Sequence, residues 1–142
     1  MVAAALYSAV DDVLTHYQLD VAQGTLARRA SLRMPAKVQY AWRHPNLRVL
    51  YVSTSNGGPR VLADHNHVTA FAIGADGSLS QLGASQPLSR RAVHMCVDPS
   101  GRFALNGHNF PTSGITVHAI NPHRSVGARV VQPGPLDHGI FP

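Results

Sequence analysis

Histidine is the reactive residue type that stands out in this chain, with nine copies among 142 residues. His65 and His67 are separated by one residue, and alternate side chains of a strand point to one face, so the two rings could bind a metal together. A protein metal site needs further ligands, and no second cluster of His with Cys or carboxylate residues occurs at ligand spacing. We therefore predict no bound metal for this chain.

A second group of polar residues surrounds His94. Arg90 and Arg91 precede it, and the segment 106–111 that follows contains His108 and Asn109. These side chains are too far apart in the sequence to act together unless the fold brings them together. The elements that carry them therefore decide whether they form a site.

An internal repeat identifies those elements. Pro45 and Arg48 recur as Pro99 and Arg102, each fifty-four residues later, within the segments 41–52 and 95–105. Three alternating segments recur at similar spacing, at 14–19, 68–73 and 115–120. Self-similarity at roughly 40–50 residues, combined with short alternating strands, is typical of β-propeller blades. The sequence therefore predicts an all-β fold made of propeller blades.

Alternation and turn residues such as Gly77 and Gly101 place the expected strands. Three strands are predicted first, at 4–9, 13–20 and 26–33. Four follow at 38–43, 48–55, 67–73 and 79–85, and four more at 92–97, 103–108, 115–120 and 127–132. Residues 1–142 are thus expected to form one partial propeller domain, with repeats at about 1–35, 36–87 and 88–135 and the start of the next blade at 136–142.

This arrangement amounts to two complete four-stranded antiparallel blades plus part of a third. A closed propeller has about 4–8 blades, so the predicted fold is incomplete relative to a closed ring. Unpaired sheet edges promote association, and we expect the remaining blades or another chain to cover them. We interpret the chain as the N-terminal part of a larger propeller.

The segment 93–103, which reads VHMCVDPSGRF, resembles the blade motif CHLSVDPTGRF of the seven-bladed lactonase family. That family includes propeller-type 6-phosphogluconolactonases and fungal carboxymuconate-lactonizing enzymes. Three further pieces match in order and spacing: 55–59, 68–73 with 76–79, and 109–111 before 114–117. The chain departs from the most similar subgroup at His108, where that subgroup has Tyr.

The resemblance implies a seven-bladed ring and a cofactor-free hydrolase of a sugar lactone, most simply 6-phosphogluconolactone in the pentose phosphate route. A chain that is inactive as a fragment is one alternative, and two others on the same fold stay open. One is a lactonizing cycloisomerase of the carboxymuconate type, and the other is a non-catalytic scaffold that binds proteins.

Blade geometry indicates where the polar residues lie. The start of the inner strand and the loop between the second and third strands share one propeller face, which places Arg91, His94 and the segment 106–111 on one rim of the channel. Lactone hydrolysis needs a base, an oxyanion donor and, for a phosphosugar, a cation. His94 is accordingly the candidate catalytic base or carbonyl polariser. The candidate substrate-binding residues are Arg91 for an anionic group, Asn109 as a polar donor, and His108.

Each of these residues also has a purely structural interpretation. An inner-strand histidine can bond to the neighbouring blade, an asparagine such as Asn109 commonly forms turns, and Arg90 and Arg91 can be solvated loop residues.

Composition limits the partners. The net charge is +5, but the arginines are scattered and aromatics make up only 6%, so we expect no nucleic-acid partner and favour a small anionic lactone. No apolar stretch approaches the roughly 18 residues that cross a bilayer, so no membrane partner is expected. The single cysteine, Cys96, and the lack of a signal-peptide pattern favour a cytoplasmic location.

Overall fold

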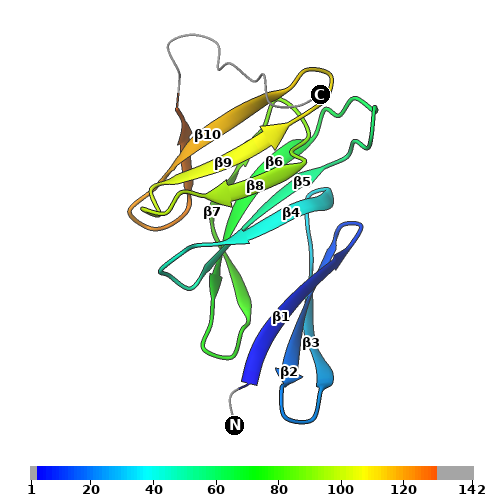
Figure 1. Cartoon of the computed structure of the whole chain (residues 1–142), viewed down its shortest axis with the longest axis vertical. Coiled ribbons are helices and arrows are strands. Elements are labelled where there is room, and N and C mark those ends of the chain that lie inside the picture. The colour runs from blue at the N-terminus through cyan, green and yellow to red at the C-terminus, as the bar shows by residue number, and fades with distance from the viewer. Residues whose placement is uncertain (1–2, 131–142) are drawn as a thin grey trace.

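The computed structural model describes residues 3–130, which form three antiparallel sheets and confirm the predicted all-β fold (Figure 1). The first sheet contains β1 (Ala3–Val10), β2 (Val13–Asp20) and β3 (Thr25–Arg33). The second contains β4 (Lys37–Arg43), β5 (Val49–Ser55), β6 (Asn66–Ile73) and β7 (Leu79–Pro87). The third contains β8 (His94–Val97), β9 (Phe103–His108), β10 (Gly114–Ile120) and β11 (Val126–Arg129). The inner strand expected at 136–142 lies outside the described residues.

Within each sheet, consecutive strands are neighbours and run up and down, as in a propeller blade. The first sheet has three strands and the other two have four. In each four-stranded sheet the first strand along the chain lies at an edge, so β4 and β8 occupy equivalent edge positions. These two strands contact each other, and β7 contacts β11 at the opposite edges. The second and third sheets therefore stack with matching strand order, like adjacent blades.

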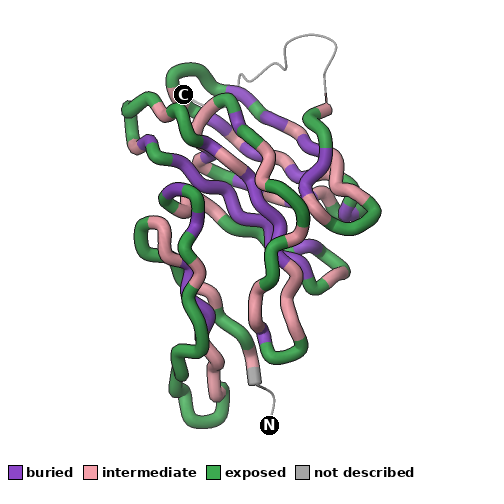
Figure 2. Tube along the Cα trace, turned by 180° about the vertical axis from the view of Figure 1, so that it is seen from behind, coloured by how far each residue is buried: buried purple, intermediate pink, exposed green. Residues whose placement is uncertain are grey.

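The apolar core lies between the sheets, because blades bury their faces against one another. All seven residues of β5 are buried (Figure 2). Alternate side chains of this strand point to opposite faces, so Leu50 and Val52 pack towards the first sheet while Val49 and Tyr51 pack towards the third. A strand buried on both faces reads as a continuous apolar run, which is what the sequence shows at 49–52.

The repeated Pro and Arg positions mark the turn between the first two strands of each four-stranded sheet. In the third sheet the Asp98 carboxylate accepts hydrogen bonds from the backbone N–H groups of Arg102 (2.8 Å) and Phe103 (2.7 Å). In the second sheet His44 stands at the equivalent position, and its Nδ1 accepts from the N–H groups of Asn46 and Leu47, both at 3.1 Å. The repeat thus conserves an acceptor for the turn while changing the residue that supplies it.

Candidate functional site

One end of the strands carries the residues that the sequence singled out. Strand register places the start of β4 beside the end of β5, and the start of β8 beside the end of β9. The β5–β6 and β9–β10 loops therefore lie at this same end. We call it the upper rim, defined by residues 37–40, 56–65, 90–94 and 109–113.

His94 opens β8 and is exposed on the edge strand of the third sheet. Its ring packs edge-on against Tyr40 of β4, with ring centroids 4.5 Å apart and planes at 65°. Trp42 lies 6.0 Å from the same imidazole, also edge-on. The cross-strand partner of His94 is Gly107, which has no side chain to cover the ring. His94 is thus oriented by aromatic contacts from the neighbouring sheet and is open on one flank.

Arg91 is placed on the same rim by a contact between the two sheets. Its Nη1 donates a hydrogen bond to Oε1 of Gln39 in β4 at 2.9 Å, so one end of a half-buried guanidinium is fixed. Arg90 is directed elsewhere, because its Nη1 donates to the backbone oxygens of Thr112 (2.6 Å) and Ser113 (3.3 Å) and to the Thr112 hydroxyl. Arg91 therefore joins the second and third sheets, whereas Arg90 holds the β9–β10 loop.

His108 is buried at the end of β9, only 4% exposed. Its Nδ1 lies 3.0 Å from the carbonyl oxygen of Arg91, which can only accept, so Nδ1 carries the proton. Nε2 accepts from the hydroxyl of Thr116 at 2.7 Å. Burial lowers the pKa of His108, which keeps the ring neutral in this bonding pattern. The geometry shows a residue that positions the Arg91 backbone, while direct substrate binding by His108 stays a prediction.

Asn109 follows β9 directly and is exposed on the rim. Beside it, Phe110 and Pro111 line a small cavity of about 120 Å³ together with Arg90, Arg91 and the tip of the β5–β6 loop, residues 61–63. Arg91 thus lies between this cavity and β4. The role of Asn109 as an oxyanion donor stays a prediction.

The whole segment 106–111 was expected on the rim, but only its second part is exposed there. Asn106 lies within β9, opposite Met95 and Thr116, and is fully buried between the second and third sheets. Neither its Nδ2 nor its Oδ1 has a hydrogen-bond partner among the described residues. Because Asn106 and His108 alternate on one face of β9, both point into the space between the sheets. The exposed part of the loop begins at Asn109.

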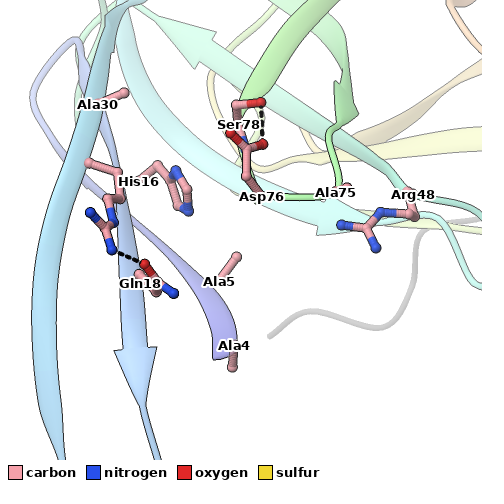
Figure 3. Close-up of a pocket in the computed structure, with 11 residues that line it drawn as sticks. Ala4, Ala5, His16, Gln18, Ala30, Arg48, Ala75, Asp76 and Ser78 are labelled. Atoms are coloured by element: carbon pink, nitrogen blue, oxygen red, sulfur yellow. Dashed lines mark hydrogen bonds between the residues drawn. The ribbon is translucent and has the colours of Figure 1, made fainter. Parts of the chain in front are cut away.

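A larger cleft of about 630 Å³ lies at the opposite end of the strands, between the first sheet and the β6–β7 turn. His16 and Gln18 of β2 face Asp76, Ser78 and Arg48 across it (Figure 3). Its charged groups are already engaged: Arg29 binds the Gln18 amide oxygen, Arg48 donates to the carbonyl oxygens of Ile73 and Gly74, and Ser78 donates to Asp76. Nε2 of His16 has no hydrogen-bond partner among the described residues, so this cleft keeps one free imidazole nitrogen.

The two histidines considered for a metal site, His65 and His67, differ in burial. His65 is exposed in the β5–β6 loop beside Asp64, at 3.8 Å, while His67 is half-buried in β6. Within residues 3–130, no three His, Cys, Asp or Glu side chains come together in a metal-binding group. In the same part of the chain no helix is long and apolar enough to cross a bilayer.

Sequence reasoning missed the aromatic residues beside His94. Tyr40 and Trp42 alternate on β4, so their side chains share one face, and their rings lie 6.5 Å apart at 20°. The alternation of Tyr40 and Trp42 on the first strand of a blade was the feature of the sequence that could have indicated an aromatic face. What they contact could not be seen, because His94 lies more than fifty residues away in the sequence.

Comparison with known proteins decides the family. The sequence profile of the family described as "Lactonase, 7-bladed beta-propeller" matches residues 2–137. This chain belongs to the seven-bladed β-propeller lactonase family. The family resemblance of the segment 93–103 is thereby confirmed. Among curated proteins, none matches this lactonase-family chain significantly.

Solved structures that resemble the chain include two bacterial proteins. One is a protein from Bacteroides fragilis, provisionally described as a 6-phosphogluconolactonase, with a TM-score of 0.71 and 13% identity over 87% of this chain. The other is a periplasmic gluconolactonase from Pseudomonas aeruginosa, with a TM-score of 0.71 and 20% identity over 92% of this chain. The lactonase-family chain spans 34% and 38% of their lengths. At this identity the likeness shows the fold, and three sheets account for about a third of a full propeller.

Proposed function

We propose that this chain forms part of a propeller that hydrolyses a sugar lactone, with 6-phosphogluconolactone as the substrate. The observation that carries the proposal is the placement of His94, exposed on an edge strand and held by Tyr40, with Arg91 on the same rim. The family membership and the names of the two solved relatives support the same chemistry.

In this proposal His94 acts as a general base. Its imidazole takes a proton from water as the water oxygen bonds to the lactone carbonyl carbon. The carbonyl oxygen becomes an oxyanion, for which the exposed amide of Asn109 is the candidate donor. The carbon–oxygen bond of the ring then breaks, and the imidazolium returns its proton to the departing oxygen. The products are an open-chain hydroxy acid and an unchanged histidine, so no cofactor is required.

Arg91 supplies the anion contact in this proposal. Guanidinium forms paired hydrogen bonds with phosphate, and fixing one nitrogen on Gln39 reduces the conformational freedom that binding must remove. A lactonizing cycloisomerase acting on a substrate with several carboxylates would need several rim arginines. Arg60, Arg90 and Arg91 all lie on the rim, and Arg90 is turned to the β9–β10 loop, so a substrate comparison decides between the two chemistries.

The test is a substrate comparison with the full-length protein that contains this chain. Loss of lactone is followed for 6-phosphogluconolactone, gluconolactone and a carboxymuconolactone, each against its spontaneous rate. We expect the highest kcat/KM with the phosphorylated sugar lactone. Turnover of the muconolactone alone would select the cycloisomerase, and turnover of none of them would select the non-catalytic scaffold.

Two expectations accompany the proposal. The remaining blades, in the same chain or another, cover the edges of the first and third sheets, because an exposed strand edge promotes association. A cytoplasmic location fits a pentose phosphate substrate and the single cysteine. Fractionation of the source cell tests that location directly, and recovery in the periplasm would contradict it.

A further inference from the structure

Tyr40 and Trp42 of β4 form an aromatic face that is partly exposed to solvent. Tyr40 is half-buried and packs against the apolar cluster between the second and third sheets. Trp42, two residues further on the same face, is 40% exposed, although Trp is a residue that proteins normally bury in large part. Tyr40 therefore anchors an aromatic face, and Trp42 extends it into solvent.

This aromatic face lies next to His94. Strands β4 and β8 are the edge strands of adjacent sheets and lie side by side (Figure 1). The His94 ring meets the Trp42 ring edge-on, at 6.0 Å and 69°. A flat ligand lying parallel to the indole would therefore lie steeply inclined to the imidazole plane.

This geometry suits a lactone ring. Water must add to the carbonyl carbon of a lactone over the face of the ring, and a ring stacked on the indole keeps its other face free for a water held by the imidazole. A sugar lactone also carries C–H bonds polarised by neighbouring oxygens, and the face of an aromatic ring has the complementary negative quadrupole. Binding sites for small molecules commonly combine such an aromatic wall with a few placed polar groups.

We propose that Trp42, supported by Tyr40, is the wall on which the sugar-lactone ring stacks while its carbonyl meets His94. This inference rests on the proposed function and adds a binding and specificity residue to it. Arg91 then holds the anionic end of the ligand, and the indole holds its ring.

The test compares Trp42→Ala and Trp42→Phe in the full-length protein with Leu26→Ala. Leu26 is 54% exposed on β3, away from the rim, so this control removes a similar exposed apolar side chain. We expect Trp42→Ala to raise KM for the sugar lactone about tenfold, equivalent to roughly 1.4 kcal/mol, with kcat within about twofold. Trp42→Phe keeps an aromatic face and should raise KM by no more than about threefold. An unchanged KM in Trp42→Ala overturns the proposal.

A binding measurement separates this inference from the proposed function. Trp42 is the single tryptophan among these 142 residues, so the fluorescence difference between the wild type and Trp42→Phe reports on it. We expect glucose 6-phosphate, a cyclic phosphosugar with no lactone bond to hydrolyse, to change this signal saturably. If no sugar lactone is turned over but the signal still saturates, the proposed function fails and the stacking wall stands. A signal that does not respond overturns the wall whether or not turnover is seen.

Discussion

His44 at the end of β4 donates a hydrogen bond from Nε2 to the carbonyl oxygen of Gly101, 3.2 Å away in the β8–β9 turn. The direction of this bond follows from the other ring nitrogen, because Nδ1 already accepts from two backbone N–H groups of its own turn. One neutral imidazole therefore closes a turn in the second sheet and joins it to the third. Gly101 has φ of +72°, and any Cβ there would overlap the His44 ring.

This contact predicts a stability difference between two glycines. Gly24 also has a positive φ, +64°, but a Cβ there would meet nothing within 4 Å. Gly24→Ala should cost about 1–2 kcal/mol in unfolding free energy for the left-handed backbone alone. Gly101→Ala should cost about 1–3 kcal/mol more, because the methyl group collides with a packed ring. Urea denaturation of both variants measures this difference, and adding His44→Ala should remove most of the excess. Equal losses in the two glycine variants would show that the contact is unimportant.

Two buried histidines predict how stability depends on pH. Burial lowers the pKa of His108 and His118 below the ordinary 6.5, and nearby arginines lower both further. The unfolded chain therefore takes up protons at a higher pH than the folded chain does. Stability should be highest above pH 6.5 and should fall as the pH drops from 6.5 through the folded-state pKa values. Denaturation series between pH 8 and 5 measure this slope.

The matched variants are His108→Gln and His123→Gln. His108 is buried, whereas His123 is exposed in the β10–β11 turn. His108→Gln should flatten the acid loss of stability even though it lowers stability at neutral pH, and His123→Gln should leave the slope unchanged. A His108→Gln protein with the wild-type slope would contradict the assigned cause.

Arg91 predicts a substrate-dependent effect. Arg91→Ala should raise KM for 6-phosphogluconolactone about 10–100-fold, because a hydrogen bond to a charged group contributes about 1.5–3 kcal/mol. KM for unphosphorylated gluconolactone should change little. Arg102→Ala, which removes an exposed arginine at the far end of β9, is the control and should alter neither value. A similar loss with both substrates would mean that Arg91 acts on the structure rather than on the phosphate.

The strands could be predicted from the sequence because each depends on local patterns. The apolar run at 49–52 and the turn glycines Gly77 and Gly101, both with positive φ, fix where strands begin and end. The β-strand expected at 103–108 is found at Phe103–His108. Its alternation already implied that Asn106 and His108 share a face, and only the stacking of the second and third sheets shows that this face is buried.

The site was less accessible to sequence reasoning because it depends on contacts between sheets. His94 could be placed on a rim from blade geometry, and the structure shows it exposed there. Its contacts with Tyr40 and Trp42, and the Arg91–Gln39 bond, join residues about fifty positions apart. Nothing in a single sequence specifies how two stacked sheets are aligned, so these partners could not be named in advance.

The measurement that tests the account most directly is the lactonase kcat of the full-length His94→Ala variant. We predict a loss of about 10²–10⁴-fold relative to the wild type, the usual contribution of a general base. His123→Ala, which removes an exposed histidine far from the rim, should keep the wild-type kcat, and both variants should stay folded, with a cooperative thermal unfolding transition. A folded His94→Ala protein with kcat within about twofold of the wild type would contradict the assignment of His94.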